Sequence, residues 1–551
     1  MDGTLVDFLK DTIMIWLIIS ACSTQEEPQQ IKKEKEVTNV LPPCEGEGIL
    51  IPTNSGCILG LEYDGTELFL GIPYAEPPIG DLRWKRTVPV KPWADVFYAN
   101  ATSAACTQLT ENGEIWGEED CLTLNVFRPK DRDPSEPLPI LFFTHGGSFK
   151  NGVGSFDVFE YMPTLAKEAI LVTYNYRLGP FGFLAHQAFT EEDESIHGGN
   201  GSSGNFGIFD SNTALQWVYD NAEHFDGDPN QIMIFGESAG GVTTCIQLTT
   251  PQTEGIFSSA LIQSGNCTYI NTPLEEAQNF GADFSSALGC EGSNEEIANC
   301  LREKSPSEIV NLDLTAFAND RGFYPNIDNV LLTDEVGVLL YTGNFHKVPI
   351  ISGVNANEGS MFVHQMGISS QEELENTLEE WSVYFGVSDL ETLTTLYHKD
   401  VHGSPQAAFD QFYGDVVFVC PIKHSLGMFS HYTPAYGYYY SHVPSWNEYF
   451  PELEGWGAYH GSELNFVFGT NLEYLTSEEQ QMSEKIRDIW ISHAKGLDMT
   501  DYLGWDKFQE VNYTQFEEEH WLEIQTGDFE VISDVHNERC NFFFEQWFGN
   551  Q

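Results

Sequence analysis

The residues best placed to do chemistry lie in the run FGESAGG at positions 235–241. Its core has the spacing G-x-S-x-G and directly follows the apolar residues 232–234. This pattern is typical of a strand that ends in a sharp turn before a helix, with a serine hydroxyl at the apex. Glycines flank the serine because a Cβ there would clash with the neighbouring strand and helix. The run therefore predicts nucleophilic catalysis by Ser238, and the rest of the chain must supply its partners.

A serine hydroxyl is a weak nucleophile, so it needs a neighbouring base, a group that orients the base, and donors for the oxyanion. The backbone N–H of Ala239 is one expected donor, since it directly follows the serine. The run HGGSF at 145–149 follows an apolar stretch at 138–144 and predicts a glycine-rich loop at the end of a strand. We expect the N–H groups of this loop to supply further donors.

His460 is the expected base. It lies in the loop-like run WGAYHGSEL at 456–464, downstream of the serine, and satisfies the chain order serine, acid, histidine. His145 is the alternative base, but its place beside the glycine-rich loop favours a positioning role. Glu358 is the expected acid because it follows an apolar stretch at 348–353. A carboxylate at such a strand end can accept the imidazole N–H and stabilise the imidazolium.

These residues need a scaffold that brings the ends of several strands together. Apolar, β-branched or aromatic runs predict buried strands at 138–144, 170–176, 231–235, 259–263 and 348–353. Helical patterns lie between them, at 213–223 and after Ser238. This alternation predicts an α/β fold with a large, mostly parallel sheet flanked by helices on both faces. Stretches rich in helix formers, at about 275–345 and 365–430, predict insertions around the carboxyl edge of the sheet.

The chain is strongly acidic. Its 551 residues include 83 acidic and 25 basic side chains, which give a formal net charge of −58. Such a chain repels phosphate backbones and anionic membrane surfaces, so nucleic-acid binding is not expected. The acidity is spread along the sequence and indicates a solvated surface; an acidic patch that steers cationic ligands is the alternative.

The N-terminus has the features of an export signal. The apolar run at 13–19 is too short to span a bilayer but suits a signal peptide. It leads into the run ISAC, which resembles a bacterial lipobox with Cys22 as the lipidated residue; ordinary cleavage near Ala21 is the alternative. Residues 1–22 are thus a predicted signal peptide and 23–47 a polar tether. Either cleavage exports the protein, as a membrane-anchored lipoprotein in the periplasm or at the cell surface, or as a secreted protein.

Ten cysteines follow Cys22, an even number that favours pairing in an oxidising compartment. Two pairs can close short loops, each worth about 3 kcal/mol, and a third would tie the C-terminus to the body. These pairs are Cys106 with Cys121, Cys290 with Cys300, and Cys420 with Cys540. The other four stay open: Cys44 and Cys57 are a further candidate pair, whereas Cys245 and Cys267 are either paired or buried thiols.

Further ordered motifs resemble the type B carboxylesterase/cholinesterase family of the α/β-hydrolase superfamily. They are GIPYAEPP at 71–78, EDCLTLNVF at 119–127, NYRLG at 175–179 and GNFGIFD at 204–210. The resemblance runs from about residue 48 to 548, which implies one catalytic domain; with the N-terminal signal, it indicates a bacterial exported or lipoprotein member. Matched residue by residue, it implies Ser238 as nucleophile, Glu358 as acid and His460 as base.

The resemblance also assigns roles around these residues. It implies oxyanion donors at Gly147, Ser148 and Ala239, although Ser148 stands where the family often has a third glycine and its Cβ narrows the hole. Glu237 and Glu463 match carboxylates that tune the electrostatics of the site. Two of the expected disulfides, Cys106–Cys121 and Cys290–Cys300, match pairs common in the family, and Cys420–Cys540 matches one more typical of cholinesterases.

The implied reaction is hydrolysis of a small-molecule carboxylic ester through an acyl-enzyme, without metal or cofactor. Met361 stands where cholinesterases favour an aromatic residue, and the 106–121 loop is shorter than theirs although it keeps Trp116. We therefore expect broad carboxylesterase specificity, with a cholinesterase-like enzyme as the alternative. A non-catalytic adhesion protein of the same family is disfavoured because all three triad residues are present. Action on water-insoluble esters and the oligomeric state stay open.

Overall fold

The computed structural model describes residues 44–548 apart from 111, 156–164, 269–271, 313–321, 471–473 and 509–518. The predicted signal peptide with Cys22, and nearly all of the predicted tether, lie outside the described residues. Within these ranges, no helix has both the length and the apolar character needed to cross a membrane.

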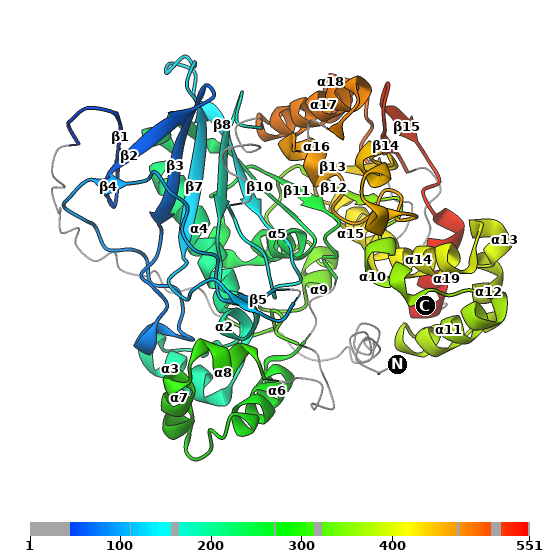
Figure 1. Ribbon diagram of the computed structural model, residues 1–551, viewed down its shortest axis with the longest axis horizontal. Coiled ribbons are helices and arrows are strands. Elements are labelled where there is room, and N and C mark those ends of the chain that lie inside the picture. The colour runs from blue at the N-terminus through cyan, green and yellow to red at the C-terminus, as the bar shows by residue number, and fades with distance from the viewer. Residues whose placement is uncertain are drawn as a thin grey trace.

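A single large sheet organises the molecule (Figure 1). In the described ranges it has 13 strands in the order β1-β2-β3-β7-β9-β8-β10-β11-β12-β13-β14-β15, with β4 (Phe97–Tyr98) beside β2. The centre is parallel and consists of β9 (Ile170–Tyr174), β8 (Leu138–Thr144), β10 (Gly227–Glu237), β11 (Ser259–Gln263), β12 (Ile350–Asn355), β13 (Ala435–Tyr440) and β14 (Trp521–Ile524). Antiparallel strands extend it at both ends: β1 (Ile49–Thr53), β2 (Gly56–Tyr63), β3 (Thr66–Pro73), β7 (Thr123–Pro129) and β15 (Glu530–Ile532).

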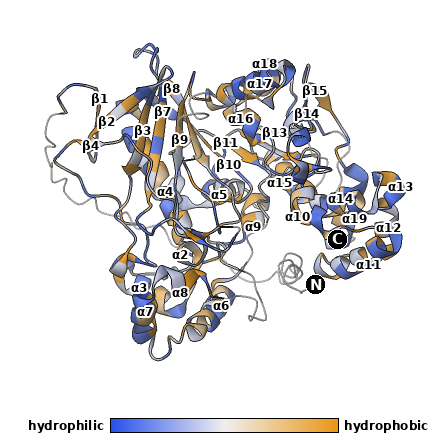
Figure 2. Cartoon of the chain, viewed as in Figure 1, coloured by the Kyte–Doolittle hydropathy of each residue, from blue (hydrophilic) through white to orange (hydrophobic). Residues whose placement is uncertain are grey.

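The central strands are buried on both faces. In β8, Ile140 and Phe142 belong to one hydrophobic cluster, while the alternating Leu141 and Phe143 belong to another. The first cluster includes residues of α4 (Phe206–Asn221) and α5 (Ala239–Thr249), and the second includes residues of α17 (Ser477–Ala494). Figure 2 shows hydrophobic colours along these strands and hydrophilic colours on the outer helices. Helices on both faces thus keep the sheet out of water and hold its carboxyl edge rigid.

Helical insertions follow β11 and β12. After β11 come α6 (Leu274–Ala287), α7 (Asn294–Glu303), α8 (Pro306–Val310) and α9 (Val336–Tyr341). After β12 come α10 (Ser360–Val363), α11 (Gln371–Tyr384), α12 (Leu390–Leu396), α13 (Lys399–His402), α14 (Pro405–Gly414) and α15 (Cys420–Ser430), with a π-helical turn at Asp415–Val419 before α15. In Figure 1, α6, α7 and α8 lie with α2 (Gly179–Phe183) and α3 (Gln187–His197), whereas α9 lies beside α5. The second group lies with α19 (Asn537–Phe548). Two short helices, α16 (Leu464–Phe468) and α18 (Met499–Leu503), flank α17.

The predicted α/β class is confirmed, and individual elements differ from expectation mainly at their ends. The strands expected at 138–144 and 259–263 have those bounds, whereas the strand expected at 170–176 ends at Tyr174. The strand expected at 231–235 is longer at both ends, because it runs from Gly227, which pairs with Leu138 across a shift in register, to Glu237. The strand expected at 348–353 runs from Ile350 to Asn355. The helix expected at 213–223 begins at Phe206 and ends at Asn221.

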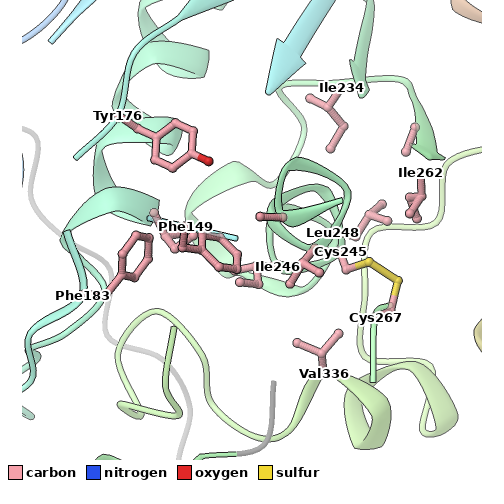
Figure 3. Packing of buried hydrophobic residues seen from close by; sticks show 14 of the residues in the cluster. Phe149, Tyr176, Phe183, Ile234, Cys245, Ile246, Leu248, Ile262, Cys267 and Val336 are labelled. Carbon is pink, nitrogen blue, oxygen red and sulfur yellow. A yellow bond between two sulfur atoms is a disulfide. The ribbon is translucent and has the colours of Figure 1, made fainter. Parts of the chain in front are cut away.

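All ten cysteines of the described residues form disulfides. The pairs are Cys44–Cys57, Cys106–Cys121, Cys245–Cys267, Cys290–Cys300 and Cys420–Cys540. The alternative that Cys245 and Cys267 are thiols is therefore wrong. Helix α5 carries Cys245 back along the sheet to within 5.3 Å, between Cα atoms, of Cys267, which follows β11 (Figure 3). Spacing alone could not give this pair because the contact depends on how α5 packs against β11.

Candidate active site

Ser238 occupies the sharp turn between β10 and α5. Its φ of 55° and ψ of −122° lie where side chains other than glycine are rare. Glycines on both sides make the turn possible. A Cβ on Gly236 would lie 2.4 Å from the Gly240 carbonyl, and a Cβ on Gly240 would lie 2.0 Å from the Thr144 carbonyl oxygen. The Ser238 N–H donates to the Gln263 carbonyl of β11 at 2.9 Å, which fixes the turn against the next strand.

The glycine-rich loop after β8 packs directly against Ser238. A Cβ on Gly146 would lie 3.0 Å from the Ser238 Cβ and 2.7 Å from the Glu237 carboxyl oxygen. Only glycine at 146 therefore allows the loop and the serine to approach this closely. Ser238 itself is half-buried, so part of the residue is in contact with solvent.

This loop presents backbone N–H groups beside the serine. Gly147, Ser148 and Phe149 have positive φ values of 103°, 53° and 59°. Among the described residues, the N–H groups of Gly147 and Ser148 have no protein acceptor. The Ala239 N–H opens α5, where helices leave N–H groups unpaired. Donors that are left free beside a nucleophile are suited to bind a developing oxyanion.

His460 and Glu358 are in direct contact although 102 residues separate them. The His460 Nδ1 lies 2.6 Å from the Glu358 Oε2, and both side chains are buried. Glu358 follows β12, and His460 lies in the turn before α16, so the two meet beside the carboxyl edge of the sheet. Because an ionised carboxylate can only accept, Nδ1 carries the proton and Nε2 is the nitrogen that can act as a base.

Two residues that the sequence did not reveal fix the Glu358 carboxylate. Its Oε1 accepts a hydrogen bond from the Ser264 hydroxyl at 2.6 Å and from the Asn355 N–H at 2.7 Å. Asn355 ends β12 and Ser264 directly follows β11. Both oxygens of the carboxylate are thus occupied, and the carboxylate cannot turn away from His460.

Two further carboxyl groups surround His460. The Glu237 Oε1 lies 3.1 Å from the His460 Nε2, without the alignment of a hydrogen bond. Glu463 accepts from the Gln263 amide at 3.1 Å and from the Asn355 amide at 2.5 Å. The histidine is therefore enclosed by three acidic side chains, all of them buried.

This enclosure shifts the proton affinities of the site. Burial alone would lower the pKa of His460, but the charges of Glu237 and Glu358 raise it to about 9. Burial raises the pKa of Glu237 to about 7, against the opposing effect of His460. Burial and the two other carboxylates raise the pKa of Glu463 to about 8. The site consequently holds protons at neutral pH, and the charge of Glu237 controls how readily His460 can become neutral.

The His460 ring packs against one side of a cluster of two aromatic side chains that also stack on each other. The centroids of Phe362 and Phe418 lie 5.1 and 4.6 Å from the centroid of the imidazole. Among the described residues, the His460 Nε2 has no hydrogen-bond partner, so no bond to the Ser238 hydroxyl is formed. Such bonds are often long in free enzymes and tighten when substrate binds.

His145, the alternative base, is engaged elsewhere. Its ring stacks on Tyr176 with centroids 4.5 Å apart, and its Nδ1 pairs with the Gly146 carbonyl at 2.8 Å. Burial lowers the pKa of His145 to about 4. These contacts suit the positioning role expected from the sequence, since the ring supports the loop rather than facing a carboxylate.

Comparison with known proteins identifies the family. Residues 47–543 match the model of the carboxylesterase family. The chain belongs to this family. It is 30% identical to an acetylcholinesterase of Danio rerio, over 88% of this chain and 83% of that protein. It is 32% identical to a cholinesterase of Mus musculus, over 90% and 86% of the two chains.

The solved structure of a PNB esterase confirms the α/β-hydrolase fold. It is similar to this chain with a TM-score of 0.73 and 29% identity, and the match covers 90% of this chain and 99% of that one. The predicted family and fold class are thus confirmed, which places the chain among the carboxylic ester hydrolases.

Three polar residues around Glu358 in this carboxylesterase-family chain were not predicted from the sequence. Gln263, Ser264 and Asn355 belong to none of the motifs that carry the resemblance. They do lie at or just past the carboxyl ends of two central strands. A polar residue that ends a buried apolar run was the available signal, because the carboxyl ends of parallel strands meet at one edge.

Proposed function

We propose that this chain is a serine esterase that hydrolyses small carboxylic esters through an acyl-enzyme on Ser238. His460 acts as general base and acid, and Glu358 orients it and stabilises its positive charge. The observation that carries this proposal is the 2.6 Å contact between the His460 Nδ1 and the Glu358 Oε2. Ser238 lies in the sharp turn between β10 and α5 in the same site. That contact leaves Nε2 as the proton acceptor that a serine nucleophile needs.

In the first half-reaction, the Ser238 oxygen attacks the ester carbonyl carbon, and its proton passes to the His460 Nε2. The carbonyl oxygen becomes an oxyanion that accepts hydrogen bonds from the N–H groups of Gly147, Ser148 and Ala239. A single preorganised donor of this kind is worth about 3 kcal/mol in the transition state. The bond to the alcohol then breaks, and the alcohol leaves with the proton from Nε2.

In the second half-reaction, water takes the place of the alcohol. Its proton passes to the His460 Nε2 as its oxygen attacks the acyl carbon. The tetrahedral intermediate collapses, the bond to the Ser238 oxygen breaks, and that oxygen regains a proton from Nε2. The carboxylic acid is released, and the same donors and the same base have served both steps.

Glu237 and Glu463 tune the site in this proposal. The Glu237 carboxyl stabilises the imidazolium that forms in both half-reactions, because it lies 3.1 Å from Nε2. Glu463 supports the network through Asn355, which also donates its backbone N–H to Glu358.

We further propose broad carboxylesterase specificity. Phe362 and Phe418 line the histidine with apolar surface, which suits an acyl chain as well as a cation. A site for a quaternary ammonium group would favour an aromatic residue at position 361, whereas this chain has Met361, with an exposed side chain. The cholinesterases among the relatives favour the alternative, a preference for choline esters.

A panel of esters tests the specificity. We expect p-nitrophenyl acetate, butyrate and octanoate to be hydrolysed with kcat/KM values at least equal to those for acetylthiocholine and butyrylthiocholine. A tenfold or greater preference for either choline thioester over the p-nitrophenyl ester of the same acyl group would establish the cholinesterase alternative instead.

A pair of serine variants tests the reaction itself. We expect Ser238→Ala to lower kcat for p-nitrophenyl butyrate by at least about 10⁴-fold. Ser382→Ala is the matched control because Ser382 is a buried serine on α11, where its hydroxyl donates to a helix carbonyl. It should keep wild-type kcat. Wild-type protein that neither hydrolyses these esters nor reacts with an organophosphate would support the non-catalytic adhesion protein.

We also infer that the protein is exported, with Cys22 as a lipidation site. All ten cysteines of the described residues form disulfides, which are typical of proteins in an oxidising compartment and rare in the cytosol. In a bacterial host, Cys22→Ser should move the protein from the membrane fraction to the soluble exported fraction. An unchanged distribution of the two proteins would favour ordinary cleavage near Ala21 and free secretion.

A further inference from the structure

Three buried amide side chains hold the loop that carries the proposed oxyanion donors. We call them the amide clamp: Gln108, Asn125 and Asn175, each 4% exposed. They come from separate parts of the chain. Gln108 lies on the short strand β5 (Gln108–Leu109) inside the loop closed by Cys106–Cys121, Asn125 lies on β7, and Asn175 directly follows β9.

The Gln108 side chain hydrogen-bonds both the backbone N–H and the carbonyl of Gly152, in the glycine-rich loop. The Gly152 N–H donates to the Gln108 Oε1 at 2.8 Å, and the Gln108 Nε2 donates to the Gly152 carbonyl at 2.8 Å. The second N–H of the amide donates to the Cys106 carbonyl at 2.9 Å. Every strong donor of this side chain is therefore used, and two of its three bonds hold Gly152.

The other two members of the clamp hold Gly154. Its N–H donates to the Asn175 Oδ1 at 2.8 Å, and its carbonyl accepts from the Asn125 Nδ2 at 3.2 Å and from the Thr173 hydroxyl. A Cβ on Gly154 would lie 2.4 Å from the Tyr174 carbonyl oxygen, so the backbone lies against β9. The far end of the loop is thereby fixed to two strands of the sheet.

A tight turn connects Gly152 to the proposed oxyanion donors. The Gly147 carbonyl accepts from the N–H groups of Lys150 and Asn151, at 2.9 and 3.0 Å. Asn151 directly precedes Gly152, and a Cβ on Gly152 would lie 2.2 Å from the His145 ring. A shift of Gly152 would therefore move the turn that orients Gly147 and the residue after it.

The loop needs such support because its backbone is strained. Ser148 and Phe149 are L-residues at φ values of 53° and 59°, a conformation that costs of order 1 kcal/mol or more at each residue. Strain of this kind persists only where the surroundings over-determine the conformation. The clamp supplies hydrogen bonds at Gly152 and Gly154, just past the strained residues.

We propose that Gln108 is a positioning residue that preorganises the oxyanion donors of Gly147 and Ser148 through its two bonds to Gly152. The inference rests on the proposed function. It gives the disulfide loop 106–121 a part in the reaction, since this loop carries Gln108 against the catalytic loop. Preorganised donors act mainly in the transition state, so their loss lowers kcat and leaves KM nearly unchanged.

Gln108→Met tests the proposal because methionine keeps the length of the side chain and removes its hydrogen bonds. Rates are taken per active site, titrated with an organophosphate. We expect kcat for p-nitrophenyl butyrate to fall about 30-fold or more with KM within threefold. Affinity for a trifluoromethyl ketone, which forms a tetrahedral adduct, should fall by a similar factor. A wild-type kcat in Gln108→Met would overturn the proposal.

Asn221→Leu is the matched control. Asn221 is a buried amide at the end of α4 that accepts the Asn54 N–H and donates to the Trp217 carbonyl, each at 2.7 Å. It should lower stability without lowering kcat per titrated site. An equal fall of kcat in Asn221→Leu and Gln108→Met would overturn the positioning role, because any lost buried amide would then have the same effect.

Gln108→Glu gives a second test that also applies if Gln108→Met does not fold. A protonated carboxyl group can accept from the Gly152 N–H and donate to its carbonyl, whereas a carboxylate cannot donate. The ratio of variant to wild-type kcat should therefore rise as pH falls, and a flat or falling ratio would overturn the proposal. Failure of wild-type protein to hydrolyse esters would instead overturn the proposed function, and the inference with it.

Discussion

Replacing Glu358 with glutamine tests the proposed base more sharply than deleting the side chain. The Glu358 Oε1 accepts from Ser264 and Asn355, at 2.6 and 2.7 Å, while Oε2 faces the His460 Nδ1 at 2.6 Å. A glutamine has one accepting oxygen and one donating nitrogen. Because two donors converge on the Oε1 position, the amide oxygen must take that place, which turns the NH₂ group toward His460.

The expected magnitude follows from the tautomer that this arrangement imposes. Facing an NH₂ donor, the neutral His460 must accept at Nδ1, and its proton then sits on Nε2. Nε2 is the atom that takes the proton from Ser238, so the base is blocked while the geometry stays intact. In the serine-protease template the corresponding change of aspartate to asparagine lowers kcat about 10⁴-fold, which is about 5.5 kcal/mol of barrier. We expect a loss of that order for Glu358→Gln.

The assay is kcat per titrated active site for p-nitrophenyl butyrate, with Glu479→Gln as matched control. Glu479 is also a buried carboxylate paired with a histidine, at 2.9 Å from the His442 Nε2. Its substitution should reduce stability and leave kcat within threefold of wild type. A loss of less than tenfold in Glu358→Gln, with folded protein, would refute the assignment of Glu358 and the tautomer argument.

Further variants probe the electrostatics and the backbone of the site. Glu237→Gln should lower the raised pKa of His460, because the Glu237 charge helps to raise it. The acid limb of the kcat/KM profile should therefore move to lower pH, since the base must be neutral to act; an unmoved limb would count against Glu237. The pKa of Glu463 is about 8 in the folded state and about 4.5 in the unfolded state, so the unfolded protein loses this proton at lower pH and stability falls as pH rises from about 4.5 to 8. In Glu463→Gln, Tm should fall less than in wild type over this window. An equal fall of Tm in the two proteins would contradict the raised pKa of Glu463. Ser148→Gly should keep kcat within about threefold, because the proposed donor is the backbone N–H; a tenfold loss would give the hydroxyl a role. Gly240→Ala should destabilise the protein by about 3 kcal/mol or more, because the alanine Cβ would lie 2.0 Å from a backbone oxygen. The loss should appear as lower soluble yield or faster thermal inactivation. Wild-type yield and stability would contradict the close packing of the turn that holds Ser238.

The central strands were predictable because each is a buried apolar run with breakers at its ends. The run at 259–263 is short and has the apolar residues Ala260, Leu261 and Ile262 at its centre, and this length favours a buried strand over a helix. The end of β9 was misplaced because Asn175 and Tyr176 continue the pattern. Their polar atoms instead make tertiary contacts: Asn175 with Gly154 and the Tyr176 hydroxyl with the His145 carbonyl.

The candidate site was predictable where a motif or the family resemblance points to it. Ser238 stands in the G-x-S-x-G run, and the resemblance implies Glu358 as acid and His460 as base. The contact between the last two agrees with that expectation. Ser264 and Gln108 stand in no such motif, and the motifs that contain Asn125 and Asn175 do not show that these amides hold the glycine-rich loop. Gln108 and Gly152 are 44 residues apart, and only the packing of the disulfide loop against the glycine-rich loop brings them together.

Labelling with an organophosphate tests the central claim most directly. Stoichiometric inactivation followed by peptide mass spectrometry should give a single adduct on the Ser238 hydroxyl, in proportion to the loss of esterase activity. The Ser238→Ala protein should take up no label. Full inactivation with the adduct on another residue, or esterase activity that survives complete labelling of Ser238, would contradict the account.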